Sequence, residues 1–273
     1  MTSENQRLQR PGGSALAFDV VGKGPLVVCV PGMGELRSSY RHLIPPLVAR
    51  GFRVASFDLR GHGDSDAAFT AYDDDALADD LVALLETLGG KAVVLGSSMG
   101  AAGATLVAAR RPDLIAGLVL IGPFVRETGT PILRLLIRLL LLRPWGPAMW
   151  KRYYRSLTPT GGPVDYEEHA ALVAASLARP GRWHAFQRTA GTSHAEAEAA
   201  LSAIAAPVLI VMGDADRDFP SPAGEAAAIA EAIGNQAKVA MIAHAGHYPM
   251  AESVDETLAV VLPFVEEVAL HAL

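Results

Sequence analysis

Residues 93–100 read Val-Val-Leu-Gly-Ser-Ser-Met-Gly, and this stretch carries most of the information in the sequence on the fold and the candidate site. An apolar, β-branched run stops at Gly96, and small, helix-compatible residues occupy positions 99–110 directly after Ser98. The segment 96–100 fits the Gly-x-Ser-x-Gly pattern of a nucleophilic serine at a sharp strand-to-helix turn. Glycines two positions before and after the serine leave room for the strand and the helix to close on that turn. We therefore predict that Ser98 is presented at a helix N-terminus, where backbone N–H groups favour developing negative charge.

Strand-like and helix-like runs alternate along most of the chain. The expected strands are Ala15–Val21, Leu26–Val30, Arg53–Asp58, Ala92–Gly96, Ile115–Ile121, Val208–Gly213 and Lys238–Ile242. The expected helices are Ser38–Arg50, Ala71–Leu88, Met99–Arg110, Ala223–Ile233 and Val254–His271. Continuous apolar strands alternating with amphipathic helices predict an α/β fold, a mostly parallel, doubly wound sheet covered by helices on both faces. We expect the first two strands to form a hairpin-like antiparallel pair.

The alternation of strand-like and helix-like runs breaks between residues 124 and 202, where the sequence pattern is helical or irregular. This segment carries ten Lys and Arg against six Asp and Glu, a balance of +4. Because the whole chain has a net charge of −6, the remainder carries −10. Such a shift inside a regular α/β pattern predicts an inserted helical cap at 124–202, between core segments 1–123 and 203–273.

The stretch Ile132–Leu142 within this cap is very apolar. It has eleven residues and carries Arg134 and Arg138, so it is too short and too charged to span a bilayer, which needs about 20 residues. We expect it to be buried against the core or over a pocket. The alternative is contact with a membrane surface, because an apolar stripe flanked by arginine can lie at an interface.

The composition limits the classes of protein that this chain can belong to. Its 273 residues, 51% of them hydrophobic, suffice for one α/β domain with a large core. No basic tract offers phosphate neutralisation, which argues against a nucleic-acid partner. Cys29 is the single cysteine and lies in an apolar run, so we expect a buried, unreactive thiol. Residues 1–13 are polar and show no secretory signal, so we expect a soluble, cytoplasmic protein.

A serine hydroxyl becomes a useful nucleophile only when a neighbouring base removes its proton. A histidine oriented by a carboxylate is the expected base. His247 lies in Ala-Gly-His-Tyr-Pro, after the last expected strand and before the final helix. A tight Gly-His turn there could swing the imidazole over the strand ends. We therefore prefer His247 to its local rival, His244.

The carboxylate is expected in the loop that follows the strand at 208–213. The sequence continues as Asp214-Ala215-Asp216-Arg217-Asp218, and loops after parallel strands are where α/β sheets place functional groups. Periodicity does not choose among the three aspartates.

From about residue 16 to residue 270 the chain resembles the α/β-hydrolase superfamily. The resemblance rests on the elbow around Ser98 and on stretches at 30–34 (Val-Pro-Gly-Met-Gly), 58–65 (Asp-Leu-Arg-Gly-His-Gly-Asp-Ser) and 246–247 (Gly-His). The chain order of serine, aspartate and histidine is the one that this family requires.

The segment 213–220 (Gly-Asp-Ala-Asp-Arg-Asp-Phe-Pro) is similar to the family's Gly-x-x-Asp-x-x-x-Pro acid loop. That match implies that Asp216 is the catalytic carboxylate, with Asp214 as the alternative candidate.

The resemblance also implies an oxyanion hole made of two backbone N–H groups, those of Met33 and Met99. Losing one such donor typically costs about 100- to 1000-fold in rate. Many relatives have His-Gly at the start of the first loop, whereas this chain has Pro31-Gly32. The glycine and the donor position are kept, so we still expect the hole to form.

In a family whose cap roofs the active site, residues of the cap and its junction can line the substrate pocket. The candidates are Phe124, Val125, Trp145, Trp150 and Tyr154. The acidic and histidine-containing segment 58–66 resembles a structural turn of the family, so we expect no metal site. We also expect no bound cofactor, because Gly22-Lys23-Gly24 leads into a strand and not into a helix.

These inferences predict a serine hydrolase that cleaves a carboxylic ester, or a related acyl bond, of a small to medium apolar substrate through an acyl-enzyme. A carbon–carbon bond hydrolase, thioesterase, lactonase or cofactor-free perhydrolase would use the same triad. Serine at position 98 argues against the haloalkane dehalogenases and epoxide hydrolases, which resemble this fold but use aspartate there. A ligand-sensing protein without turnover is the alternative from another class. The expected partner is the small substrate; we expect no stable membrane insertion, and the sequence does not indicate an oligomeric state.

Overall fold

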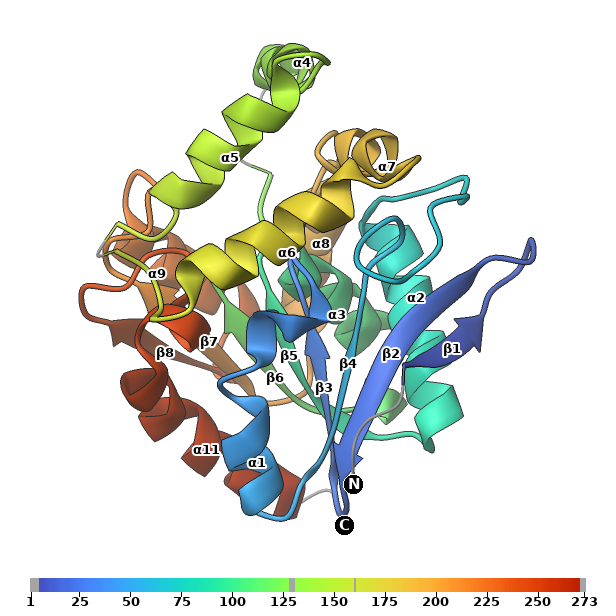
Figure 1. Ribbon diagram of the computed structural model, residues 1–273. Helices are drawn as coiled ribbons and strands as arrows, with labels where there is room; N and C mark the ends of the chain where they lie inside the picture. Colours follow the sequence, from blue (N-terminus) through green and yellow to red (C-terminus); the bar gives the residue numbers. More distant parts are fainter. Residues whose placement is uncertain (1–4, 128–130, 160, 271–273) are drawn as a thin grey trace.

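The computed structural model describes residues 5–127, 131–159 and 161–270, and its centre is one eight-stranded sheet (Figure 1). The strands are β1 (Gln6–Gln9), β2 (Ala15–Gly22), β3 (Leu26–Val30), β4 (Arg53–Phe57), β5 (Ala92–Ser97), β6 (Ile115–Ile121), β7 (Val208–Gly213) and β8 (Ala237–Ile242). Their order in the sheet is β1-β2-β4-β3-β5-β6-β7-β8. The six strands from β4 to β8 in that order pair in parallel, while β1 and β2 are antiparallel. The predicted mostly parallel α/β sheet is thereby confirmed.

Helices cover both faces of this sheet. The helices and 3₁₀ turns are η1 (Arg37–Tyr40), α1 (Ile44–Ala49), α2 (Asp74–Leu88), α3 (Met99–Arg110), η2 (Pro112–Leu114), α4 (Pro131–Leu140), α5 (Gly146–Ser156), α6 (Tyr166–Ala178), α7 (Arg182–Thr189), α8 (Ala195–Ala200), η3 (Leu201–Ala203), α9 (Pro222–Ile233), α10 (Pro249–Glu252) and α11 (Val254–Leu270). One apolar layer joins the sheet to α2, α3 and α9, and the other joins it to α1 and α11. Successive side chains of a strand enter opposite layers: Val94 enters the first, and Val93 and Leu95 enter the second.

The expected antiparallel pairing of the first two predicted strands is wrong. The strand Ala15–Gly22 pairs with β1 and β4, and Leu26–Val30 lies between β4 and β5 in parallel with both. All but the first residue of Leu26–Val30 are buried, whereas the second half of Ala15–Gly22 is only half-buried. A continuously apolar strand gains most from an interior position, and this separates it from its sequence neighbour.

The first expected helix, Ser38–Arg50, is two pieces in the structure. The 3₁₀ turn η1 ends at Tyr40, and α1 begins at Ile44. Pro45 and Pro46 follow at once, and proline is tolerated in the first turn of a helix but not in its interior. A continuous helix would have placed both prolines in its middle.

The segment predicted as a cap lies between β6 and β7, and its described residues form α4–α8 and η3 without a strand. Helices α5, α6 and α7 lie beyond the carboxyl ends of the parallel strands, and α4 lies at the far end of the molecule (Figure 1). Helix α8 instead packs against α3. No helix among the described residues combines the length and apolarity needed to cross a bilayer.

The expected burial of Ile132–Leu142 is wrong for most of the stretch. Among its described side chains, Ile137 and Leu141 pack inward. The other large aliphatic side chains that the structure describes there are 41–71% exposed. The physical reason is that α4 projects beyond the sheet, so none of the residues that the structure describes covers its outer side. Cys29 is buried as expected, and burial raises the pKa of its thiol well above the usual range.

Candidate active site

Ser98 occupies a strained turn between β5 and α3. Its backbone has φ 52° and ψ −123°, and only one other non-glycine residue in the described part of the chain, His244, has a positive φ. Such a conformation costs about 1–3 kcal/mol and persists when the surroundings fix it. Here the N–H of Ser98 donates to the carbonyl of Ile121 at 2.9 Å, and its carbonyl accepts from the N–H of Phe124 at 3.3 Å. Strand β6 and the residues after it therefore hold the turn in place.

Two glycines are required at this turn because other backbone comes very close. A Cβ atom added at Gly96 would lie 2.6 Å from the carbonyl oxygen of Gly100. One added at Gly100 would lie 2.3 Å from the carbonyl oxygen of Val30. Neither oxygen belongs to a side chain that could rotate away.

The loop after β3 passes directly beside the serine. A Cβ atom at Gly32 would lie 2.7 Å from the Cβ of Ser98, so the loop that contains the next residue, Met33, passes beside Ser98. Met99 is the first residue of α3, and the N–H groups of a first helical turn have no acceptor within the helix. Both candidate donors thus lie near Ser98.

His62 anchors this loop, a role that the sequence did not indicate. The N–H of Gly34 donates to Nε2 of His62 at 3.0 Å, and Nδ1 of His62 donates to the carbonyl of Arg60 at 3.0 Å. Burial lowers the pKa of His62, which favours the neutral ring that such an acceptor requires. The segment that resembles a structural turn therefore supports the loop that carries Met33.

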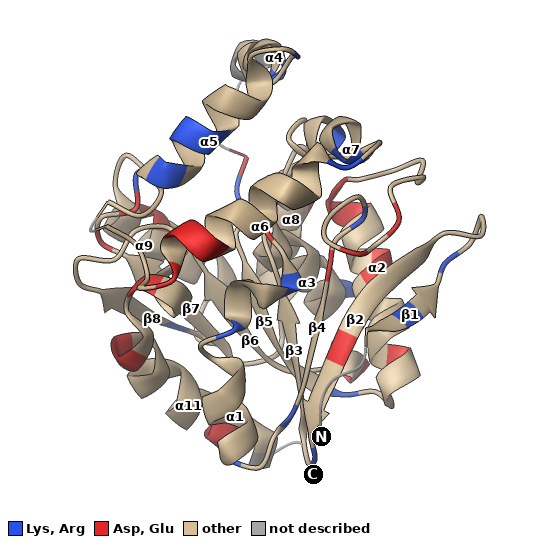
Figure 2. Ribbon diagram, viewed as in Figure 1, with Lys and Arg blue, Asp and Glu red and all other residues tan. Residues whose placement is uncertain are grey.

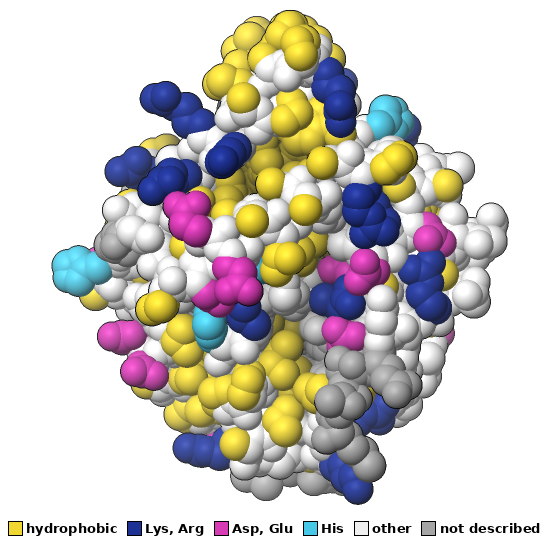
Figure 3. All heavy atoms as spheres, viewed as in Figure 1, with side chains coloured by type: hydrophobic (Ala, Val, Ile, Leu, Met, Phe, Trp, Pro, Cys, Tyr) yellow, Lys and Arg dark blue, Asp and Glu magenta, His cyan; other side chains and the backbone are white. Residues whose placement is uncertain are grey.

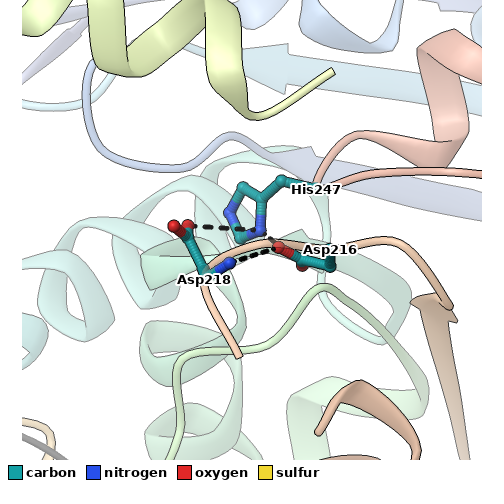
Figure 4. Close-up of side chains that lie close together, drawn as sticks. All are labelled: Asp216, Asp218 and His247. Atoms are coloured by element: carbon teal, nitrogen blue, oxygen red, sulfur yellow. Dashed lines mark hydrogen bonds and ion pairs between the residues drawn. The ribbon is translucent and has the colours of Figure 1, made fainter. Parts of the chain in front are cut away.

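His247 and Asp216 form a buried pair in the loops after β8 and β7 (Figure 4). Nδ1 of His247 donates to Oδ2 of Asp216 at 2.8 Å, and the N–H of His247 donates to the carbonyl of Leu157 at 2.9 Å. The alternative carboxylate, Asp214, is exposed and accepts a hydrogen bond at 2.7 Å from the N–H of the alternative histidine, His244. Of the three aspartates in the loop, Asp214 is the one turned away from the imidazole.

Asp218 is a second carboxylate at the imidazole, and the sequence reasoning did not single it out. Its Oδ2 atom lies 3.6 Å from Nδ1 of His247, and its N–H donates to Oδ1 of Asp216 at 3.0 Å. The hydroxyl of Tyr153, on α5, donates a hydrogen bond to Asp218. The only available signal was an aspartate two positions after Asp216 in the same acid loop.

The charges around His247 change its proton affinity. Burial lowers the pKa of the imidazole, but the neighbouring carboxylates of Asp216 and Asp218 outweigh this effect and raise the pKa to about 9. Burial raises the pKa of Asp218 itself. The two carboxylates therefore favour the protonated form of His247.

Residues 122–124 contact both the turn of Ser98 and His247. A Cβ atom at Gly122 would lie 3.2 Å from Nδ1 of His247, and the ring of Phe124 lies 5.7 Å from the imidazole, centroid to centroid. Among the described residues, no hydrogen bond joins Oγ of Ser98 to His247. Catalytic hydrogen bonds are often long in the absence of substrate and tighten in the complex.

The structure brings some of the predicted pocket residues to this site and places others elsewhere. Phe124 packs between His247 and Phe219. Val125 is fully buried in the layer that contains α3. Trp145 is half-exposed and donates from Nε1 to the carbonyl of Leu139 at 3.0 Å.

Trp150 and Tyr154 are buried on the inner side of α5. A Cβ atom at Gly34 would lie 2.4 Å from the Trp150 ring, so this ring covers the loop beside Ser98. The hydroxyl of Tyr154 donates to Oε1 of Glu35 at 2.5 Å, and His169 of α6 lies 2.9 Å from Oε2. Buried Glu35 therefore connects α5 and α6, two helices of the segment predicted as a cap, to the loop after β3.

Asp216, Asp218 and His247 are also the one described group of three side chains whose potential metal-ligand atoms lie within 4.8 Å of one another. Two carboxylates and an imidazole could coordinate a divalent cation. The atoms that face one another already satisfy each other, because Nδ1 donates to Asp216 and Tyr153 donates to Asp218. This chemistry fits an oriented imidazole better than a metal ion.

Comparison with known proteins places this arrangement in a family. A sequence model of the family described as serine aminopeptidase, S33, matches residues 6–254. The chain belongs to this family, within the α/β-hydrolase superfamily. A solved thermophilic esterase from Thermogutta terrifontis is 26% identical, with a TM-score of 0.80 over 98% of this chain and 99% of that one.

Curated relatives match over shorter stretches. AB hydrolase superfamily protein YfhM of Bacillus subtilis (strain 168) is 36% identical over 115 residues, which are 40% of this chain and 40% of YfhM. Epoxide hydrolase B of Mycobacterium tuberculosis is 41% identical over 100 residues, which are 36% of this chain and 28% of that enzyme. The chain therefore matches less than half the length of each of these relatives. Together these matches support a hydrolase of the α/β-hydrolase superfamily.

Proposed function

We propose that the protein is a serine hydrolase that cleaves a carboxylic ester, or a related acyl bond, of a small to medium apolar substrate. The observation that carries this proposal is the buried hydrogen bond between His247 and Asp216. Residues 122–124 contact both this pair and the strained turn that presents Ser98. The proposed nucleophile, base and orienting carboxylate follow the parallel strands β5, β8 and β7.

In the proposed reaction, Oγ of Ser98 attacks the carbonyl carbon while Nε2 of His247 takes the hydroxyl proton. Asp216 holds the proton on Nδ1 and stabilises the imidazolium. The N–H groups of Met33 and Met99 bind the oxyanion. His247 then gives its proton to the leaving alcohol, and the ester C–O bond breaks to leave an acyl-enzyme. His247 next deprotonates a water molecule that attacks the acyl carbon. The bond from that carbon to Oγ of Ser98 then breaks, His247 returns the proton to Oγ, and the acid leaves.

The side chains around these groups support an apolar substrate. Phe124 and Phe219 pack together beside the imidazole, with ring centroids 5.0 Å apart. Trp150 covers the loop that carries Met33. Aromatic walls with a few oriented polar groups are typical of small-molecule sites, and here they fit an acyl or alcohol group better than a charged one.

The identity of residue 98 separates the hydrolase alternatives only in part. The curated relatives include proteins named as epoxide hydrolases, and the resemblance assigns those enzymes an aspartate at this position, where this chain has Ser98. A carbon–carbon bond hydrolase, thioesterase, lactonase or perhydrolase would keep the same three residues. The substrate panel below distinguishes the first three of these from an esterase.

A fluorophosphonate probe tests the nucleophile. We expect the wild-type chain to be labelled and Ser98→Ala to be unlabelled, with kcat on an activated short-chain ester lower by about 10⁴–10⁶-fold. Ser97→Ala is the matched control, because Oγ of Ser97 is buried without a hydrogen-bond partner among the described residues. It should keep both labelling and turnover.

A panel of esters, thioesters, lactones and vinylogous diketones tests the bond type. Preferred turnover of esters would support the proposal, and preference for another class would replace it with that activity. Labelling of Ser98 with turnover below about 1 s⁻¹ on every substrate would favour a ligand-sensing protein. An unlabelled wild-type chain would overturn the assignment of the nucleophile.

A further inference from the structure

The outer side of α4 is an exposed apolar stripe. Its members are Ile132, Leu135, Leu136, Leu139 and Leu140, and they are 48–71% exposed. Their spacing of three, one, three and one places them on a single face of the helix. In a globular protein such a stripe ordinarily faces the core, and here it faces away from the sheet.

The stripe continues onto the residues that lead into α5. Leu142, Trp145 and Met149 are also large apolar side chains exposed by at least 41%. Figure 3 shows hydrophobic side chains gathered over the tip that α4 forms, with Lys and Arg side chains beside them. A contiguous apolar patch of this kind marks a site of interaction. We call residues 131–156 the cap tip.

The cap tip is also strongly basic. It carries six Lys and Arg and no Asp or Glu, in a chain whose net charge is −6. Figure 2 shows the basic residues along α5. Arg143, Lys151 and Arg152 are exposed and form no ion pair with any residue that the structure describes. Their charges are therefore available to an anionic partner.

We propose that the cap tip docks the protein on the surface of a membrane that contains anionic phospholipids. Helix α4 has ten residues and is about 15 Å long, so it lies in the plane of the interface and does not span it. Its aliphatic stripe enters the boundary of the acyl chains, while Arg143, Lys151 and Arg152 meet the headgroup phosphates. Trp145, which is about half-exposed, has the amphipathic ring that prefers this boundary.

The same features argue against the other occupants. A second copy of the chain would bring six positive charges against six, because a two-fold interface places the same surface on both sides. An acidic protein would satisfy the charges, but a convex aliphatic tip suits a fluid apolar layer better than a preformed groove. The lipid surface is the one partner that fits both the charge and the shape.

Cosedimentation with lipid vesicles tests the proposal. We expect the full chain to pellet with vesicles of phosphatidylcholine mixed with phosphatidylglycerol, and much less with phosphatidylcholine alone. High salt should release it, because it screens the basic side chains. The double variants Leu135→Gln/Leu139→Gln and Lys151→Gln/Arg152→Gln should each bind about tenfold more weakly or worse.

Two matched controls lie away from the cap tip. Val239→Gln/Met241→Gln removes two exposed apolar side chains from the edge strand β8. Lys23→Gln/Lys91→Gln removes two exposed lysines next to the amino ends of the paired strands β3 and β5. Both controls should bind like the wild type. All four variants should unfold at the wild-type temperature, which separates lost docking from lost folding.

Three results would overturn the proposal. One is a wild-type chain that stays in the supernatant with both kinds of vesicle, which would leave an acidic protein as the partner. Another is undiminished binding by Leu135→Gln/Leu139→Gln. The third is a dimer in sedimentation velocity that this variant dissociates, without vesicle binding, because the stripe would then be an interface between copies. None of these results depends on the proposed ester hydrolysis.

Discussion

The Oδ2 atom of Asp218 lies 3.6 Å from Nδ1 of His247, so the imidazole faces two carboxylates and not one. The second carboxylate also accepts a hydrogen bond from Tyr153 on α5. A helix of the cap segment is thereby connected to the histidine through a single side chain. Together the carboxylates of Asp216 and Asp218 raise the pKa of His247 to about 9, so protonation of the proposed base depends in part on a carboxylate that α5 contacts.

Replacing Asp218 by asparagine should shift the pH profile of the reaction. The base form of His247 is needed for attack, and removal of one nearby negative charge lowers the pKa of the imidazole. We expect the midpoint of the rise in kcat/KM to move to lower pH, by on the order of one pH unit. Esterase assays from about pH 6 to about pH 10, in steps of about 0.5 pH units, are fine enough to locate such a shift.

Asp216→Asn is the contrasting variant, since it should lower kcat by about 10⁴-fold at every pH by favouring the wrong tautomer. Tyr153→Phe keeps the carboxylate and should move the midpoint less than Asp218→Asn does. An unchanged midpoint in Asp218→Asn would show that the second carboxylate does not act on the histidine.

The raised pKa of His247 also predicts how stability depends on pH. Folded His247 binds its proton more tightly than the unfolded chain does, since the pKa rises from 6.5 to about 9. Its contribution is fully present below pH 6.5 and is lost as the pH rises toward 9. We expect the free energy of unfolding in urea to fall over this window by about 1–3 kcal/mol. His247→Gln should flatten the dependence, and an equal slope in that variant would refute this origin.

Loss of the Tyr154 hydroxyl should weaken the attachment of the cap. It donates to Glu35 at 2.5 Å, and both side chains are buried. A hydrogen bond to a buried carboxylate contributes about 1.5–3 kcal/mol, so Tyr154→Phe should lower the free energy of unfolding by that amount. Tyr166→Phe is the control, because that hydroxyl has no hydrogen-bond partner among the residues described. Equal stability of the two variants would contradict the role given to Glu35.

The sequence predicted those parts of the fold that local pattern determines. The helix expected at Met99–Arg110 has the same bounds in the structure, since a strand, a glycine-flanked turn and a run of small residues follow one another without interruption. The pairing of Ala15–Gly22 could not be predicted in this way. The order of strands in a sheet depends on which strands gain most from burial in the whole molecule. Leu26–Val30 therefore lies inside the sheet, between β4 and β5.

The candidate site, like the fold, was predictable only where local sequence pattern determines it. Periodicity does not choose among the three aspartates of the acid loop, and only the resemblance implied Asp216. The structure distinguishes them by contacts: Asp214 binds the N–H of His244, while Asp216 and Asp218 face His247. The anchoring of Gly34 by His62 also joins residues far apart in sequence. The exposure of α4 was not predicted, because an apolar stripe in a sequence does not indicate whether protein or another medium covers it.

Gly100→Ala should disable the turn itself. The new methyl group would lie 2.3 Å from the carbonyl oxygen of Val30, and a strand backbone cannot yield as a side chain can. We expect a loss of at least about 3 kcal/mol in the free energy of unfolding, together with weaker labelling of Ser98. Gly103→Ala, in the same helix, is the matched control: its methyl group would lie 2.6 Å from Cγ of the buried Leu77 side chain, so it should also lower stability, but it lies away from the turn and should keep the labelling of Ser98. If both variants were equally stable and equally labelled, β3 could not be packed as tightly against the turn as the structure has it, and the position of Met33 beside Ser98 would lose its support.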